Sequence, residues 1–335
     1  MTKILITGAG GYIGSVAASL FLEKGYEVVA VDNLARGFEG PLNYLATKYA
    51  ADKFRYYLKD IRAEINEVFA KEAGIAAVLH YAAFCNVGES EKHPELYFGN
   101  NIQITLSLLE AMKAHNVKKI LFSSTCSLYG EPQAEFISEE HPVDPTSHPY
   151  GESKYMSERI IDWYSSLFGF KRIFLRYFNV CGATDDGEIG DSKNPSYHLM
   201  QNAVRGALGI APFQLNNTPV NTPDKTPIRD YVNVVDLNEA HLLAIEYLLK
   251  EQKNDLFNLG TGTGNSVLEI ISTVEKELGV TIAKSEGERR KTDVSRAVAS
   301  NEKITRLLGW QPKRTLADSV ISLAKWYRKH PQGWR

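Results

Sequence analysis

Cysteine is scarce in this sequence, which has only Cys85, Cys126 and Cys181 among its 335 residues. An odd number of cysteines without a CxxC pair excludes a disulfide framework and gives no zinc-binding pattern, so we expect three buried, small apolar side chains. An apolar run of about 18 residues, the length that spans a bilayer, is also missing. The first residues do not form a signal-peptide pattern, so a reducing cytoplasm is the expected location.

An excess of either charge is missing as well. Lys and Arg number 38 and Asp and Glu number 40, which gives a net charge of −2. No stretch combines basic with aromatic residues, so the sequence does not indicate a nucleic-acid partner. The 8 histidines have no metal-ligand spacing. We therefore expect no metal site, and a structural role for His80.

The first half of the chain alternates apolar runs with helix-like stretches. The runs predict strands at residues 3–7, 27–31, 54–58, 76–80, 119–123 and 172–177. Their apolar residues are uninterrupted rather than alternating with polar ones, which is typical of strands covered on both faces. Helix-like stretches lie between them, ending at residue 24, spanning 62–73 and 94–116, and starting near residue 150. We therefore predict an α/β fold with a doubly wound parallel (Rossmann) sheet.

The second half is organised differently. Residues 182–228 are rich in Gly, Pro, Asn and Asp and show little regular period, as binding loops often do. A strand signal returns at 256–262, and helix-like segments follow at 266–278, 301–308 and 315–328. We expect a nucleotide-binding domain over residues 1–178. A smaller mixed α/β substrate domain is expected over 179–335, with segments near 230–262 returning to the first domain.

Glycines follow the first predicted strand. Gly8, Gly11 and Gly14 have GxxGxxG spacing between a strand and a helix, close to the dinucleotide fingerprint. Glycines there allow a tight turn and bring the backbone close to a pyrophosphate, to which the helix N-terminus presents free N–H groups. The alternative is an ordinary glycine turn. The strand–helix context favours a dinucleotide site.

Acidic residues follow the next two predicted strands. A carboxylate at Asp32 can accept hydrogen bonds from an adenosine ribose and repel a 2′-phosphate, which favours NAD over NADP. Arg36 is near enough to soften that preference, and a turn at Asp32-Asn33 is the alternative interpretation. Asp60-Ile61 is a candidate adenine contact, with a helix N-cap as an equally strong alternative.

Tyr150 and Lys154 form a YxxxK pair. On a helix this spacing puts both side chains on one face, one turn apart. A free tyrosine has a pKa of about 10, and a nearby ammonium and a positive nicotinamide ring are expected to lower it. The pair could then take a proton from a sugar hydroxyl while a hydride leaves for NAD. Because YxxxK is common by chance, an ordinary amphipathic helix is the alternative.

A hydroxyl-rich run, FSSTCSLYG at residues 122–130, begins at the end of the fifth predicted strand. Ligands of doubly wound sheets bind outside the carboxyl ends of the strands, so a hydroxyl from this run could contact the reacting oxygen. Taken alone, a polar loop would be the preferred interpretation. The YxxxK pair favours a catalytic one.

Seven segments together carry a family resemblance. They are TGAGGYIG (7–14), HYAAFCNVGES (80–90), FSSTCSLYG (122–130), YGESK (150–154), LRYFNVCGA (175–183), RDYVNVVDL (229–237) and NLGTG (258–262). In this order, and over essentially the whole chain, they resemble the UDP-glucose 4-epimerase family of extended short-chain dehydrogenases. The run SSTCxxYGEP and the terminal HPxGW are also similar to the UDP-xylose/UDP-arabinose 4-epimerase branch.

The resemblance implies an NAD-dependent UDP-sugar 4-epimerase with UDP-glucose and UDP-galactose as the favoured pair. It makes Tyr150 the base, Lys154 its electrostatic and ribose-binding partner, and Thr125 the hydroxyl that bonds the 4-oxygen. The implied cofactor contacts are Gly8, Gly11, Tyr12, Ile13, Gly14, Asp32, Asn33, Asp60, Ile61, Tyr81, Ala82, Ala83, Asn100, Ser123, Tyr150, Lys154 and Tyr177. The implied substrate contacts are Thr125, Tyr150, Asn179, His198, Leu199, Gln214, Asn216, Arg229, Tyr231, Arg290 and Asp293. Arg229 and Arg290 would clamp the diphosphate, because a guanidinium binds phosphate oxygens in pairs.

Three departures from the family pattern leave the identity of the substrate sugar undecided. Cys85 replaces a lysine that the best-known relatives carry near the cofactor, and the pentose branch also lacks that lysine. Residues 216–228 differ from the usual uracil-side loop. Ala297 stands where a bulky residue narrows the sugar pocket in some members. UDP-xylose/UDP-arabinose and UDP-N-acetylhexosamine therefore stay open as alternative substrate pairs.

Two other functions fit part of the pattern. A nucleotide-sugar 4,6-dehydratase would need an Asp-Glu pair directly after Thr125, where this chain has Cys126 and Ser127. A non-catalytic NAD-binding sensor would not need the three catalytic residues together. Family members usually form homodimers by pairing helices, so residues 94–116 and 150–168 are the candidate interface.

Overall fold

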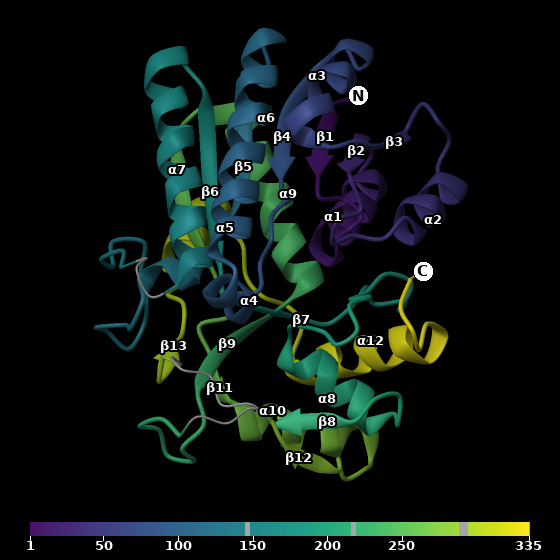
Figure 1. Cartoon of the computed structure of the whole chain (residues 1–335), viewed down its shortest axis with the longest axis vertical. Helices are drawn as coiled ribbons and strands as arrows, with labels where there is room; N and C mark the ends of the chain where they lie inside the picture. The colour runs from purple at the N-terminus through teal and green to yellow at the C-terminus, as the bar shows by residue number, and fades with distance from the viewer. Residues whose placement is uncertain (145–147, 216–218, 288–293, 335) are drawn as a thin grey trace.

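A parallel β-sheet forms the larger part of the molecule in the computed structural model, which describes residues 1–144, 148–215, 219–287 and 294–334 (Figure 1). Its strands within these residues are β1 (Lys3–Thr7), β2 (Glu27–Asp32), β3 (Phe54–Leu58), β4 (Ile75–His80), β5 (Lys119–Thr125), β6 (Lys171–Tyr177) and β10 (Asp255–Leu259). Their order is β10-β6-β5-β4-β1-β2-β3, and every pair is parallel. The predicted doubly wound sheet is confirmed.

Helices cover both faces of this sheet. One face carries α3 (Ile61–Lys71), α6 (Gln103–Ala114) and α7 (Pro149–Phe168), and the other carries α1 (Tyr12–Glu23), α2 (Gly40–Lys48) and α9 (Val234–Glu251). Because successive side chains of a strand point to opposite faces, Val28 and Ala30 belong to the core beneath α1, whereas Val29 and Val31 belong to the core beneath α3. The uninterrupted apolar runs therefore supply two cores at once.

The predicted helix over residues 94–116 is interrupted. The chain forms α4 (Val87–Lys92) and α5 (Pro94–Tyr97), then a wide π-helical turn (Phe98–Ile102) before α6 begins. Asn101, which is buried in that turn, accepts a hydrogen bond from the Phe84 backbone N–H at 2.8 Å and donates to the Ser153 hydroxyl at 3.0 Å. The turn thus connects the loop after β4 to α7 by hydrogen bonds. The spacing of hydrophobic residues in the sequence does not indicate such a contact.

A smaller α/β layer lies below the sheet in Figure 1. It contains β7 (Asn179–Cys181), β9 (Ile228–Asn233), β11 (Gly264–Ser266) and β13 (Arg296–Ala297), the separate pair β8 (Phe213–Leu215) and β12 (Lys284–Glu286), and the helices α8 (Leu199–Ala207), α10 (Val267–Leu278) and α12 (Leu316–Lys329). The prediction of an irregular stretch over 182–228 was partly wrong. It contains α8, because Met200, Ala203 and Val204 give that helix an apolar face for the core shared with α10 and α12.

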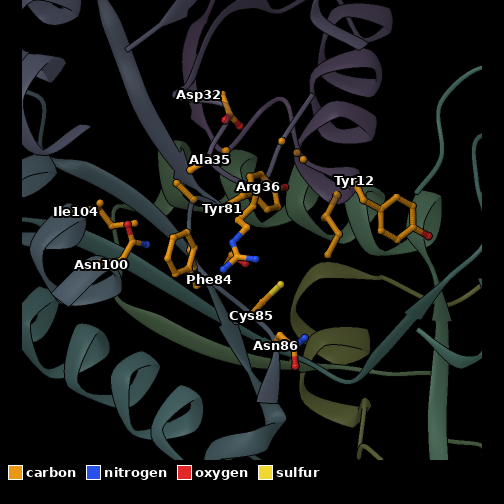
Figure 2. Close-up of a pocket in the computed structure, with 18 of the residues that line it drawn as sticks. Tyr12, Asp32, Ala35, Arg36, Tyr81, Phe84, Cys85, Asn86, Asn100 and Ile104 are labelled. Atoms are coloured by element: carbon orange, nitrogen blue, oxygen red, sulfur yellow. The ribbon is translucent and has the colours of Figure 1, made fainter. Parts of the chain in front are cut away.

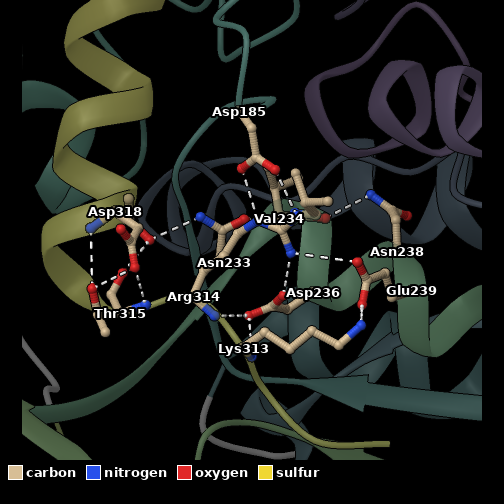
Figure 3. Close-up of polar contacts among 12 residues, drawn as sticks. Asp185, Asn233, Val234, Asp236, Asn238, Glu239, Lys313, Arg314, Thr315 and Asp318 are labelled. Carbon is tan, nitrogen blue, oxygen red and sulfur yellow. Dashed lines mark hydrogen bonds and ion pairs between the residues drawn. The ribbon is translucent and has the colours of Figure 1, made fainter.

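An ion-pair cluster fixes the start of α9 (Figure 3). The Arg314 guanidinium lies 2.5 Å from the carboxylate of Asp236, which has no exposed surface, and 2.7 Å from the carboxylate of Asp185. The backbone N–H groups of Lys313 and Arg314 donate to the same Asp236 carboxylate at 2.9 and 2.8 Å. The buried Asp236 carboxylate is therefore fully paired. Its contacts and those of Arg314 connect the loop after β7, the start of α9 and the segment that precedes α12.

None of the helices in the described part of the chain combines the length and the apolar character that crossing a membrane requires.

The remaining short elements are α11 (Glu302–Leu308) and a 3₁₀ turn (Cys126–Tyr129) that directly follows β5. This turn places the hydroxyl-rich run at the carboxyl edge of the sheet.

Candidate active site

A cavity opens at the carboxyl edge of the parallel sheet (Figure 2). The structure brings together in its lining all the predicted cofactor residues and three predicted substrate residues, of which Tyr150 belongs to both sets: Gly8, Gly11, Tyr12, Ile13, Gly14, Asp32, Asn33, Asp60, Ile61, Tyr81, Ala82, Ala83, Asn100, Ser123, Thr125, Tyr150, Lys154, Tyr177 and His198. They come from the ends of several strands and from the loops that follow, which is where doubly wound folds bind nucleotides.

The glycine turn leaves room for a ligand only because it lacks side chains. Gly8 has φ +72°, and a Cβ on it would lie 2.6 Å from the backbone N of Ala82. A Cβ on Gly14 would lie 2.3 Å from the carbonyl oxygen of Gly8. These close approaches seat the N-terminus of α1 directly against the end of β1, so its free N–H groups face the cavity.

Asp32 and Asp60 each stabilise the local backbone and also line the cavity, so the two interpretations of each residue, a ligand contact and a turn or helix cap, are compatible. The buried Asp32 carboxylate accepts hydrogen bonds from the N–H groups of Gly10 at 2.9 Å and Leu34 at 2.8 Å, and it also lines the cavity. Burial raises the pKa of that carboxyl. Asp60 caps α3 through the Arg62 N–H at 2.8 Å and lines the cavity as well. A turn or a cap therefore does not prevent either carboxylate from facing a ligand.

Arg36 is held by two residues that the sequence analysis missed. Its guanidinium carbon lies 4.7 Å from the centre of the Phe84 ring, and Nη2 lies 2.7 Å from the Glu89 carboxylate (Figure 2). All three residues line the cavity. Because Glu89 neutralises the guanidinium, Arg36 is poorly available to a 2′-phosphate. The position of Phe84 directly after a strand end was the signal that could have identified it.

The YxxxK pair lies at the start of α7. The ring nitrogen of His148 accepts a hydrogen bond from the Gly151 N–H at 3.0 Å and caps the helix, and its ring stacks on Tyr150 with 6.0 Å between centroids. Tyr150 and Lys154 are both buried and line the cavity with Thr125. Four-residue spacing on the helix therefore delivers both groups to the same wall.

Burial dominates the titration of both groups. It raises the pKa of the Tyr150 phenol well above its usual value, while a hydrogen bond with Thr125 lowers it. Burial also lowers the pKa of Lys154 to about 8. In each case desolvation penalises the charged form of the group. Phenolate formation therefore needs further positive charge in the site.

The residues present fit a dinucleotide. Lys154 is only 2% exposed, and among the described residues its ammonium contacts the Phe122 ring at 4.5 Å without a hydrogen-bond partner. A buried ammonium is expected to have an acceptor, which ribose hydroxyls would supply. The side-chain hydroxyls of Ser123 and Tyr177 contact each other on the same wall, whereas Ser124 points away and donates to Glu158 at 2.6 Å.

The prediction that all three cysteines are buried was wrong. Cys181 is buried and Cys126 is half-buried, but Cys85 is exposed and lines the cavity. Cys85 lies in the loop between β4 and α4, at the open edge of the sheet. His80 is buried against the Thr7 hydroxyl at 2.7 Å, in agreement with a structural role. Among the described residues, no group of His, Cys, Asp and Glu side chains could hold a metal ion.

The other predicted substrate residues that the structure describes lie outside the cavity lining. Asn179 on β7 pairs with Tyr231 on β9, and Arg229 on β9 pairs with Ala297 on β13. Gln214 lies on β8 and Leu199 begins α8. Asn216, Arg290 and Asp293 lie outside the described residues. The structure thus gathers Asn179, Arg229 and Tyr231 on neighbouring strands and leaves the other contacts to be tested.

Several lining residues were not among the predicted contacts. Arg36 and Cys85 are two of them, although the sequence had placed both near the cofactor. The others are Val31, Ala35, Gly37, Lys59, Phe84, Asn86, Glu89, Ile104, Phe178, Val180, Lys193 and Tyr197. Most lie within a few positions of a predicted strand end, which was an available signal. Lys193 and Tyr197 come instead from the irregular stretch after β7, where the sequence pattern does not indicate which side chains return to the sheet.

Comparisons with known proteins agree with this site. Residues 4–260 match the NAD dependent epimerase/dehydratase family. A UDP-glucose 4-epimerase of Lactobacillus helveticus is 40% identical over 334 residues, covering 99% of this chain and 99% of the relative. The crystal structure of UDP-glucose 4-epimerase from Bifidobacterium longum in complex with NAD+ and UDP has a TM-score of 0.94 and 36% identity, and covers 99% of this chain and 100% of that chain.

A further solved structure is UDP-glucose-4-epimerase from Stenotrophomonas maltophila with bound NAD and formylated UDP-arabinopyranose. It has a TM-score of 0.92 and 32% identity, and covers 99% of each chain. The resemblance that the sequence motifs carry is confirmed by these matches. NAD is the cofactor of this family, and the glycine turn and the buried lysine fit it. The chain belongs to the NAD-dependent epimerase/dehydratase family, and within it to the UDP-glucose 4-epimerases.

Proposed function

We propose that this protein is a UDP-sugar 4-epimerase that interconverts UDP-glucose and UDP-galactose. The observation that carries the proposal is the meeting of Thr125, Tyr150 and Lys154 on one wall of the cavity that also contains the glycine turn. Full-length similarity to a UDP-glucose 4-epimerase of Lactobacillus helveticus supports the choice of sugar pair.

The chemistry of the chain's own residues follows from this arrangement. Tyr150 takes the proton of the 4-hydroxyl and later returns it, and Thr125 holds the 4-oxygen by a hydrogen bond. Lys154 is the cationic partner of the phenol. When bound, NAD supplies the acceptor for the hydrogen of C4 and a positive charge that favours the phenolate. The 4-keto sugar turns its other face to the same groups before the hydrogen returns, so no net oxidation occurs.

The substrate side of the proposal assigns UDP to the second half of the chain. Arg229 and Arg290 would clamp the diphosphate. Asn179, His198, Leu199, Gln214, Asn216, Tyr231 and Asp293 would complete the contacts to the nucleotide. In this division of labour, residues 1–178 hold NAD and residues 179–335 hold UDP, with segments near 230–262 returning to the first part. Firm UDP contacts with few sugar contacts would let the sugar turn over.

The test is turnover on three substrate pairs without added reductant. The purified protein is incubated with UDP-galactose, UDP-xylose and UDP-N-acetylglucosamine in separate reactions, and the products are separated by chromatography. Conversion of UDP-galactose to UDP-glucose at the highest kcat/KM is the expected result. A 4-keto-6-deoxy product would indicate a dehydratase, and no product from protein with bound NAD would indicate a sensor; either outcome contradicts the proposal.

A homodimer formed by α6 and α7 is a second part of the proposal. These neighbouring helices expose large apolar side chains, with Trp163 61%, Leu167 65% and Leu106 39% exposed. Exposed large apolar side chains on adjacent helices are common in two-fold interfaces. Sedimentation should show a dimer that Trp163→Asp converts to a monomer, while Ile321→Asp on α12 has no effect. A monomeric wild-type protein would contradict this assignment.

A cytoplasmic location completes the proposal. Cys85, Cys126 and Cys181 are all unpaired, and thiols stay reduced in the cytoplasm. A nucleotide-sugar enzyme that needs NAD also requires a compartment that contains both compounds. Cell fractionation with an antibody against the protein tests this location.

A further inference from the structure

The C-terminal segment contains an aromatic cluster that the proposed reaction does not use. The Trp334 ring lies 5.3 Å from the Trp326 ring, 4.6 Å from the His330 ring and 6.1 Å from the Tyr44 ring, measured between centroids. A Cβ on Gly40 would lie 2.6 Å from a ring carbon of Trp334. The indole therefore lies between α12, at the end of the chain, and the start of α2 in the first half.

The same segment is pressed against the loop that follows β7. Gly333 has φ +71°, and a Cβ on it would lie 2.7 Å from the Cα of Ser192. The backbone N–H of Trp334 donates to the Ser192 hydroxyl at 3.1 Å. The indole N–H of Trp326 donates to the carbonyl oxygen of Asp191 at 3.1 Å. Residues 191–192 are thus bound both by α12 and by the C-terminal segment.

This loop forms one wall of the NAD cavity. The buried Asp191 carboxylate accepts hydrogen bonds from the Lys193 N–H at 3.2 Å and from the Ser196 hydroxyl. Lys193, Tyr197 and His198, which follow directly, line the cavity. The positive charge of Lys193 opposes the effect of burial on the pKa of Asp32, so the loop faces the adenosine side of the site.

The other element that Trp334 contacts leads to the same cavity. Arg36 and Gly37, which line the cavity, lie just before α2, and Gly40 begins that helix. Trp334 therefore contacts segments on both sides of the cofactor site, as the position of the C-terminus beside α12 and α2 in Figure 1 illustrates. Movement of the loop away from α2 requires separation of these contacts.

We propose that residues 331–334 form a strap that holds the 190–198 loop against the NAD-binding half and slows the release of NAD. Trp334 is a positioning residue in this account, because it acts through the loop and does not belong to the cavity lining. The inference concerns cofactor retention and holds whichever sugar is turned over. Loss of the strap should raise the dissociation rate of NAD and leave the chemistry of Tyr150 unchanged.

The first experiment measures NAD release directly. NAD-loaded protein is diluted into excess alcohol dehydrogenase and ethanol, which convert released NAD to NADH, and absorbance at 340 nm is followed. Trp334→Ala should release NAD about tenfold faster than the wild type, since lost contacts act mainly on the off-rate. Trp334→Phe keeps an aromatic ring between α2 and α12 and should restore slow release. At saturating NAD, kcat of Trp334→Ala should match the wild type.

A second pair of variants separates strap loss from general destabilisation. Gly333 (φ +71°) and Gly279 (φ +67°) have the same left-handed backbone, which strains an alanine at either position. Only Gly333 faces the loop, whereas a Cβ on Gly279 would have no atom within 4 Å. Gly333→Ala should accelerate NAD release and Gly279→Ala should not. The strap is disproved if both alanine variants accelerate release equally, or if neither Gly333→Ala nor Trp334→Ala changes it. The Gly333 pair decides the question even if Trp334→Ala fails to fold.

Discussion

Glu158 and Arg176 form a buried ion pair directly behind the catalytic groups. The guanidinium Nη2 and Nε lie 2.5 and 2.9 Å from the two carboxylate oxygens, and the Ser124 hydroxyl donates to the same carboxylate at 2.6 Å. Ser124 precedes Thr125 on β5, and Glu158 lies one turn beyond Lys154 on α7. The pair therefore sets the position of the catalytic strand relative to the catalytic helix.

Glu158→Gln should lower the free energy of unfolding by about 3–5 kcal/mol, because it leaves the buried Arg176 charge without the carboxylate that neutralises it. Asp162→Asn is the matched control, since it breaks the Arg172–Asp162 pair between the same helix and strand, where Asp162 is 47% exposed. That change should cost about 1 kcal/mol or less. Urea denaturation measures both, and equal losses would show that the buried pair has no special role.

Tyr150→Phe should lower epimerase turnover by about 10²–10⁴-fold, the usual contribution of a general base. Folding and NAD content should be unchanged, because the ring and its stacking on His148 are retained. Tyr164→Phe, on the same helix, removes a hydroxyl that bonds Glu110 far from the cavity lining, and should leave turnover unchanged. Near wild-type turnover of Tyr150→Phe would remove this residue from the mechanism.

Glu89→Gln should shift cofactor preference towards NADP. The change removes the negative charge that neutralises Arg36, which lies beside Asp32 in the cavity lining. The ratio of NADP to NAD affinity should rise several-fold, up to about tenfold, since Asp32 still opposes a 2′-phosphate. Calorimetry on cofactor-free protein gives both dissociation constants. Glu95→Gln, an exposed carboxylate on α5, is the control; an unchanged ratio in Glu89→Gln would contradict the assigned role of Arg36.

The stability of the protein should fall with pH through the titration of His80. Burial lowers the pKa of this imidazole from 6.5 to about 3. Between these values the unfolded chain binds a proton that the native protein does not, so stability is lost as the pH falls from 6.5 towards 3. One such group contributes up to about 1.4 kcal/mol per pH unit.

His80→Gln tests this account because glutamine can keep a polar contact with Thr7 without titrating. Unfolding free energies from urea titrations at pH 7, 6 and 5 should decline less steeply in this variant than in the wild type. His93→Gln, at an exposed position in front of α5, should leave the slope unchanged. Parallel slopes for wild type and His80→Gln would show that His80 does not carry the effect.

Local patterns predicted the large sheet well. Residues 4–6 and 28–31 are apolar at every position because each strand supplies two cores, so they are recognisable without knowledge of their partners. The glycine turn is equally local, since Gly8 and Gly14 contact each other within one short segment. YxxxK spacing places Tyr150 and Lys154 on one helix face in any environment.

Other elements could not be predicted in this way. α9 buries Asp236, Asn238 and His241 among its apolar residues, so its hydrophobic period is interrupted at positions where tertiary partners satisfy polar groups. Cys85 is exposed because it lines the cavity, and the cavity is formed by segments that are distant in the sequence. The sign of the pKa shift of Tyr150 depends on the amount of protein packed around the phenol.

The sequence by itself determined the fold class, the dinucleotide turn and the candidate catalytic residues, because each depends on residues close together in the chain. Only the tertiary structure decided that Glu89 neutralises Arg36, that burial raises the pKa of the Tyr150 phenol, and that Trp334 lies against Gly40. These outcomes depend on which distant segments come into contact and how much water they exclude. The periodicity of the sequence indicates neither the contacts between distant segments nor the exclusion of water, whereas the packed structure sets both.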